Sequence, residues 1–145
     1  VNYGVSGAGT SHNLVMTGND ISHSVFNAAT DGLNVTVDSG LTLNANIQEN
    51  ELDATFFGSG ASISAFNNST INLRMRNNVS PSDFALTTTG GATNLYFEVF
   101  GGQAVPNPLA PIDVTGQNTI GAATVDNFIG GTSTRVAPNS LPIPE

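Results

Sequence analysis

Three acidic side chains fall at related places in the sequence and could hold a divalent cation. Asp20 and Glu51 each follow an Asn in two similar segments, and Asp53 lies two residues beyond Glu51. Carboxylate oxygens are the ligands that Ca²⁺ prefers, and paired carboxylates also serve glycosidases. The simpler alternative is a solvated loop edge, because the Gly- and Asp-rich nonapeptide of calcium-binding repeats is absent. These residues are therefore candidate Ca²⁺ ligands, and we expect no other cofactor.

Two of the three arginines lie on one face of a predicted strand. Arg74 and Arg76 flank Met75, which strand alternation turns inward. Outward arginines could contact an acidic glycan, or they could pair with acidic neighbours at the surface. Pairing is the simpler interpretation, because no other basic residue joins them.

A third candidate contact follows from the alternation in residues 95–100. If Leu95 and Phe97 face a core, then Tyr96, Glu98 and Phe100 face outward. An exposed aromatic ring beside a carboxylate can stack on a sugar or contact a protein. We expect a protein contact, because aromatic residues are sparse in the chain.

The remaining chemistry is limited. The chain has no Cys, and His12 and His23 lack metal-ligand spacing. It contains no Gly-x-Ser-x-Gly nucleophile motif. The sequence therefore predicts a protein that is not an enzyme.

The charge balance restricts the partners. The chain has a net charge of −8, with three Arg and no Lys. Such a charge repels phosphate backbones and anionic membranes, so we expect no nucleic acid as a partner. No apolar run is long enough to span a bilayer.

The element that must position these residues recurs four times. The copies begin at Asn19, Asn50, Asn77 and Asn118. All four share the pattern Asn, any residue, then Ile, Leu or Val. A Phe or Val follows five positions later. Repeats of roughly 30 residues with two or three strands match one coil of a parallel β-helix.

Strands with period-two alternation lie between these copies. Alternation buries one face of a strand and exposes the other. The predicted strands cover 33–37, 41–47, 61–65, 71–75 and 95–99. The sequence thus predicts an all-β fold, namely a right-handed parallel β-helix of about three to four coils with an irregular C-terminal cap. The alternative is a β-sandwich or jelly roll, which also suits many short strands.

Stacked coils bring equivalent side chains together at about 4.8 Å. The repeated Asn side chains are therefore predicted to hydrogen-bond in a ladder. Asn also tolerates the left-handed backbone of a tight corner. We expect Phe26, Phe57 and Phe84 to form an inner aromatic column.

Here the chain resembles a known family. Residues 32–37 and 41–52 are similar to coils of large bacterial right-handed β-helix repeat proteins, the pectate-lyase-like surface proteins and adhesins. The resemblance covers about residues 12–102 and is specific for architecture. It implies the C-terminal portion of such a protein and an extracellular or bacterial cell-surface location. It also implies that Arg74 and Arg76 could serve as the basic residues that pectate-lyase-like enzymes use.

We expect a single domain over residues 1–145, with repeat coils at 12–102. Residues 103–145 are predicted to form a degenerate coil, a cap and a Pro-rich tail, with 138–145 extended on the surface. The Gly-rich start offers no comparable cap. The N-terminal end of the stack is therefore expected to stack on a partner copy or on upstream coils.

Together these features predict an extracellular structural or adhesive module that self-associates into a surface fibre or coat. The predicted partner is thus a second copy of the chain, in a homo-oligomer or self-stacking assembly. The alternative is a carbohydrate-binding or carbohydrate-active β-helix domain with a glycan partner.

Overall fold

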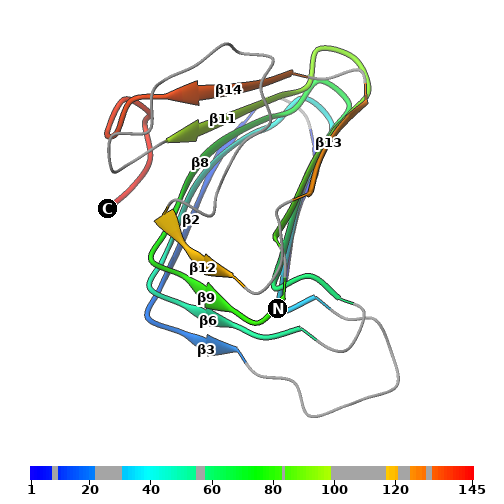
Figure 1. Ribbon diagram of the computed structural model, residues 1–145. Helices are drawn as coiled ribbons and strands as arrows, with labels where there is room; N and C mark the ends of the chain where they lie inside the picture. Colours follow the sequence, from blue (N-terminus) through cyan, green and yellow to red (C-terminus); the bar gives the residue numbers. More distant parts are fainter. Residues whose placement is uncertain are drawn as a thin grey trace.

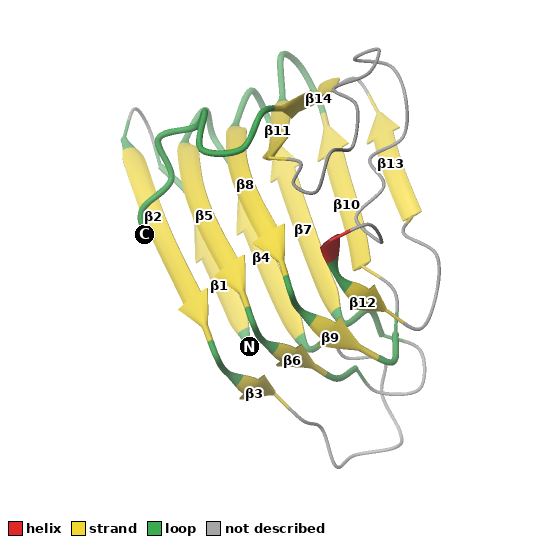
Figure 2. Cartoon of the chain, turned by 60° about the vertical axis from the view of Figure 1, so that its left-hand side comes forward, coloured by secondary structure: helices red, strands yellow, loops and turns green. Residues whose placement is uncertain are grey.

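The computed structural model describes residues 1–7, 10–21, 31–54, 58–82, 84–98, 117–120, 125–129 and 132–145. In these residues the fold is all-β, and its strands form three parallel sheets (Figures 1 and 2). Sheet A contains, in spatial order, β1 (Asn2–Val5), β4 (Leu33–Val37), β7 (Ala61–Phe66), β10 (Phe84–Thr89) and β13 (Val125–Ile129). Sheet B contains β14 (Thr132–Val136), β11 (Asn94–Glu98), β8 (Thr70–Arg76), β5 (Thr42–Gln48) and β2 (Ser11–Thr17). Sheet C contains β12 (Thr119–Ile120), β9 (Val79–Ser80), β6 (Glu51–Leu52) and β3 (Asp20–Ile21).

The connectivity follows one rule. Successive strands enter different sheets, and neighbours within a sheet are three strands apart in the sequence. We call each passage through the three sheets a circuit. Every strand pair in the described residues is parallel, as Figure 2 shows for sheet B. The antiparallel pairing of the alternative sandwich or jelly roll is therefore not found among these strands.

The core lies between the sheets and is built from columns of like side chains. In sheet A, Val35 stands beside Ile63, which stands beside Leu86. All three are fully buried, whereas the residues on either side of each along its own strand are partly exposed. Alternation in β4 and β7 therefore has the predicted phase, because parallel stacking brings equivalent residues of neighbouring circuits into contact.

The predicted aromatic column is not reproduced at Phe84. This residue is fully buried, but its register partner is Ala61, which in turn pairs with Leu33. Phe26 and Phe57 lie outside the described residues. The large ring of Phe84 is thus accommodated beside a small side chain, which fits the dense packing of protein interiors.

The turn from sheet A to sheet B uses pairs of residues with left-handed backbone. The pairs are Ser39–Gly40 (φ 64° and 75°), Asn67–Asn68 (47° and 66°) and Gly90–Gly91 (83° and 59°). Gly and Asn adopt this conformation most readily.

Candidate functional site: the covered face of sheet B

A ladder of four asparagines runs along the corner between sheets B and C. Asn19 donates from its backbone N and its Nδ2 to Asn50 Oδ1, at 3.0 and 2.9 Å. Asn50 repeats both bonds to Asn78 at 3.1 and 2.9 Å, and Asn78 repeats them to Asn118 at 3.0 and 2.9 Å. The predicted Asn ladder is therefore confirmed. It has a direction, because each side-chain oxygen accepts from the preceding circuit.

The third member of the ladder was predicted one residue too early. Asn78 occupies the ladder, whereas Asn77 takes the left-handed corner position with φ 56°. Gly18 and Glu49 hold the same position in earlier circuits, with φ 67° and 58°. In these three circuits the left-handed backbone therefore belongs to the residue before the ladder Asn, and the strand of sheet C begins at the residue after it.

A second polar column covers the outer face of sheet B. Asn44 donates to Asn13 Oδ1 at 3.0 Å, and Asn72 donates to Asn44 Oδ1 at 2.7 Å. Tyr96 is the register partner of Asn72 in the next strand. These residues lie one above another, so the outer face is fixed by side chains as well as by the backbone.

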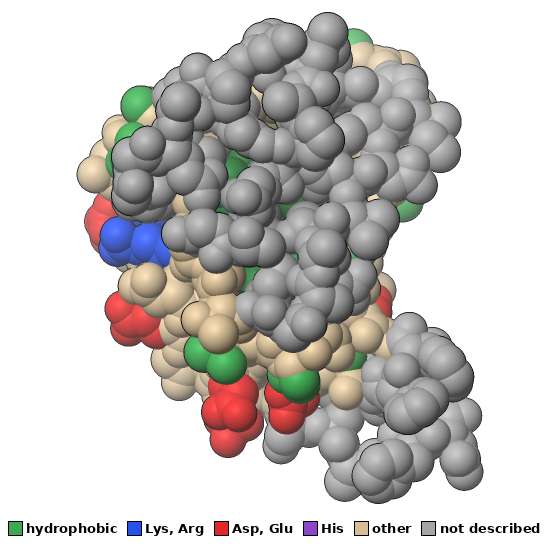
Figure 3. Space-filling model, in the orientation of Figure 1, with side chains coloured by type: hydrophobic (Ala, Val, Ile, Leu, Met, Phe, Trp, Pro, Cys, Tyr) green, Lys and Arg blue, Asp and Glu red, His purple; other side chains and the backbone are tan. Residues whose placement is uncertain are grey.

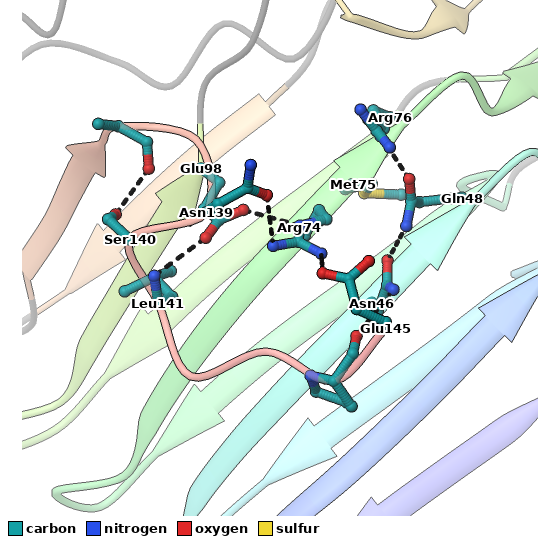
Figure 4. Close-up of polar contacts among 12 residues, drawn as sticks. Asn46, Gln48, Arg74, Met75, Arg76, Glu98, Asn139, Ser140, Leu141 and Glu145 are labelled. Carbon is teal, nitrogen blue, oxygen red and sulfur yellow. Dashed lines mark hydrogen bonds and ion pairs between the residues drawn. The ribbon is translucent and has the colours of Figure 1, made fainter.

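A buried ion pair lies on the same outer face (Figure 4). Arg74 of β8 donates from Nε to Glu98 Oε2 of β11 at 2.8 Å, and their side chains are 3% and 0% exposed. The other two guanidinium nitrogens reach the C-terminal segment, which we define as residues 137–145. Nη2 donates to Asn139 Oδ1 and Nη1 contacts Glu145 Oε1, both at 3.0 Å.

The C-terminal segment is held across several strands of sheet B. The backbone N of Leu141 donates to Glu98 Oε1 at 3.0 Å, and Asn46 Nδ2 of β5 donates to Pro144 O at 2.9 Å. Ile143 is only 8% exposed. Figure 2 shows the segment running from β14 across the outer side of β8 and β5. The segment therefore lies at the surface, as predicted, and it also covers part of a sheet face, which the sequence did not indicate.

Electrostatics at this site favour a permanently charged Arg74. Burial alone lowers the pKa of Arg74, but hydrogen bonds and attraction from Glu98 and Glu145 outweigh it and raise the pKa above its usual value. A buried charge is costly unless it is paired and hydrogen-bonded. Both oxygens of Glu98 and three nitrogens of Arg74 have partners, so the pair meets that condition.

These contacts correct part of the predicted surface. Arg74 and Glu98 point outward from the sheet as expected, and Met75 is fully buried. However, Arg74 is 2% and Glu98 0% exposed, because the C-terminal segment covers them. They are therefore not exposed contact residues in this structure.

The other predicted contact residues have different outcomes. Arg76 donates from Nε to Gln48 Oε1, and Gln48 donates to Asn46 in turn (Figure 4). Tyr96 is half-buried, and Phe100 lies outside the described residues. Arg76 is thus joined to the same polar network as Asn46, which holds the segment.

The acidic candidates are brought only partly together. Asp20 and Glu51 are register partners in sheet C, and both are exposed. Yet no three His, Asp or Glu side chains within the described ranges form a group that could hold a metal ion, so Asp53 does not complete such a group with them. Figure 3 shows acidic side chains at separate places on one face of the molecule. Ca²⁺ binding stays a prediction.

Comparisons with known proteins give no relative. No protein-family model, no curated protein and no solved structure matches the chain. The resemblance to pectate-lyase-like repeat proteins therefore stays a prediction. Among the described residues, the structure has no helix of the length and apolar character needed to cross a membrane.

Sequence reasoning did not predict where on sheet B the C-terminal segment lies. Asn46, Asn139 and Leu141 were not singled out, although all three hydrogen-bond in it. One signal was available: aligning β11 with β8 brings Glu98 next to Arg74, and two opposite charges on one outer face indicate a pair. No sequence pattern indicated what would cover that pair.

Proposed function

We propose that the chain is an extracellular structural module, built as a right-handed parallel β-helix that self-associates in a surface fibre or coat. The observation that carries this proposal is the Asn19–Asn50–Asn78–Asn118 ladder, which runs through successive circuits in a single direction. A repeated unit of this kind buries a core only by stacking on its neighbours. Such an architecture is extended by adding further circuits at its ends.

The outer face of sheet B supports a structural role. Its charged and amide side chains bond to one another and to the C-terminal segment. The alternative role in glycan binding predicted that Arg74, Arg76 and acidic residues line an outer face, and Arg74 is buried. We therefore propose the structural role alone, with Ca²⁺ at Asp20 and Glu51 as a separate question for titration.

Assembly tests the proposal directly. The purified chain should form particles larger than one copy as its concentration rises at neutral pH. Sedimentation velocity would measure their mass, and negative-stain electron microscopy would show their shape. A chain that stays monomeric at all accessible concentrations would contradict self-association. Binding to a panel of acidic glycans, without assembly, would favour the carbohydrate role instead.

A further inference from the structure

One end of the stack presents three strand edges side by side. β1, β2 and β3 are the terminal strands of sheets A, B and C, and all belong to the first circuit. Within the described residues, none has a partner strand on its far side. An unpaired edge of this kind offers backbone donors and acceptors to another chain.

The backbone register identifies which groups of β2 are available. Thr42 donates to Thr10 O at 3.3 Å, and Gly18 donates to Gln48 O at 3.2 Å. In a parallel pair, alternate residues direct both backbone groups to one neighbour. Residues 12, 14 and 16 therefore bond to β5, whereas the N–H groups of Asn13 and Val15 point away from it.

β2, the longest of these three strands, lacks the features that usually prevent pairing, whereas β3 has two residues and contains Asp20. Native edge strands are short, bulged, charged or interrupted by Pro. β2 has seven residues, and β1 and β2 contain no Asp, Glu, Lys, Arg or Pro. Val15 is 47% exposed at this edge. These strands therefore favour association, even though the chain as a whole carries a net charge of −8.

The asparagine ladder supplies a second, independent sign of an open end. Every ladder oxygen from Asn50 onward accepts two bonds from the circuit before it. No described donor precedes Asn19, so its Oδ1 lacks the pair of donors that the equivalent oxygens have. The same backbone and side-chain pattern that joins circuits inside the chain can thus continue outward.

We propose that β2 of one copy pairs in parallel with β14 of a second copy, so that copies join head to tail. This inference rests on the proposed function, because it names the contact through which self-association occurs. β14 is the opposite terminal strand of sheet B and runs parallel to β2. Such a heterologous contact repeats from copy to copy and makes an open filament.

The columns of sheet B fit this contact. Asn13 heads the column that passes through Asn44, Asn72 and Tyr96 to Thr134. Stacking β14 on β2 by the same register brings Thr134 of one copy beside Asn13 of the next. Val15 then lies near Val136. In a head-to-head contact one copy would be turned over relative to the other, so that only one of the three sheets could continue from copy to copy.

Two single substitutions block the two edges separately. Val15→Pro removes an N–H that does not bond to β5, and Val15→Thr is the matched control that keeps it. Ser133→Pro acts in the same way on β14, because Asn94 bonds to β8 and the alternation then directs the Ser133 N–H away from β11. Ser133→Thr is its control. Circular dichroism and urea unfolding check that each variant folds.

Mixing the two blocked variants gives the decisive measurement by sedimentation velocity. Each Pro variant alone should be monomeric, both Thr controls should form filaments, and an equal mixture should form discrete dimers. If Val15→Pro unfolds, Val15→Lys replaces it, since a charge also protects an edge.

The contrary outcomes are distinct. Filaments of either folded Pro variant would overturn the head-to-tail contact and leave self-association standing. Dimers of Ser133→Pro alone would indicate a head-to-head contact and also overturn it. An unsubstituted chain that never assembles would remove both this inference and the proposed function.

Discussion

Arg74 Nε donates to Glu98 Oε2 at 2.8 Å, and both side chains are almost completely buried. The two residues come from neighbouring strands of sheet B, and their remaining hydrogen bonds are made with residues 139, 141 and 145. A buried pair is poor evidence of net stability, because desolvation opposes the attraction. Its clearer consequence is positional: the charges are fully hydrogen-bonded only when the C-terminal segment lies in this one place.

Replacing Glu98 by Gln is predicted to destabilise the fold strongly. The change removes the buried counter-charge of Arg74 and leaves only the exposed carboxylate of Glu145. Breaking one side of a buried pair costs about 3–5 kcal/mol. Glu145→Gln is the matched control, because the Glu145 side chain is 88% exposed. Its expected effect is below about 1 kcal/mol. Urea unfolding of both variants, followed by far-ultraviolet circular dichroism, measures the difference.

The double variant Arg74→Leu, Glu98→Leu separates pairing from burial. Its loss in free energy of unfolding should be smaller than the sum of the losses in Arg74→Leu and in Glu98→Leu, because the double variant leaves no buried charge unpaired. Equal losses in Glu98→Gln and Glu145→Gln would contradict the structural account of this pair.

The asparagine ladder predicts a sharp effect of exchanging amide for carboxylate at Asn78. Asn78 Nδ2 donates to Ile47 O and to Asn118 Oδ1, at 3.0 and 2.9 Å. Asn78→Asp replaces this donor by an oxygen that faces two acceptors, which should cost about 2–4 kcal/mol from unmade bonds and buried charge. The measurement is the urea midpoint at neutral pH.

Asn34→Asp is the control for that exchange. Asn34 lies partly exposed on β4, and its Oδ1 accepts from Thr36 Oγ1 at 3.3 Å, which a carboxylate can also do. Its expected effect is below about 1 kcal/mol. A loss at Asn34 as large as that at Asn78 would show that added negative charge, rather than the ladder, sets the stability.

The sequence predicted those parts of the fold that local pattern determines. Alternation of apolar residues placed Val35, Ile63 and Leu73 inward, and repetition indicated the Asn ladder. Register was harder, because Asn77 and Asn78 are adjacent and either could start the copy. The choice depends on which residue takes the left-handed corner, and that is decided by hydrogen bonds to Asn50 and Asn118 in other circuits.

The candidate site was less predictable for a related reason. Arg74 and Glu98 were both recognised as outward-facing residues of strands. Their burial depends on Asn139 and Glu145, which lie 65 and 71 residues from Arg74 in the sequence. A segment without alternation, rich in Pro, carries no local signal of the surface on which it will lie. Only the three-dimensional match of charges and amides determines that place.

Gly60 is predicted to tolerate no side chain. A Cβ there would come within 2.1 Å of Ser80 Oγ and 2.8 Å of Leu52 O, so the neighbouring circuit would have to move. Gly60→Ala should cost about 1–3 kcal/mol, as overpacking of an interior usually does. Gly4→Ala is the matched control, because a Cβ at Gly4 meets no atom within 4 Å. Thermal unfolding of the two variants tests this, and similar midpoints would contradict the close packing at Gly60.

Ile143 should hold the C-terminal segment independently of the ion pair. Ile143 is 8% exposed, so Ile143→Ala removes buried apolar surface, worth about 2 kcal/mol at the lower end of such truncations. Because the segment has no strand pairing of its own, the loss should appear as local opening. Hydrogen exchange in peptides covering residues 137–145 should accelerate roughly tenfold or more, since 1.4 kcal/mol corresponds to a factor of ten. Val79→Ala, at a site 47% exposed, should leave that exchange unchanged. Uniform acceleration throughout the sheets would mean instead that the segment and the core unfold together.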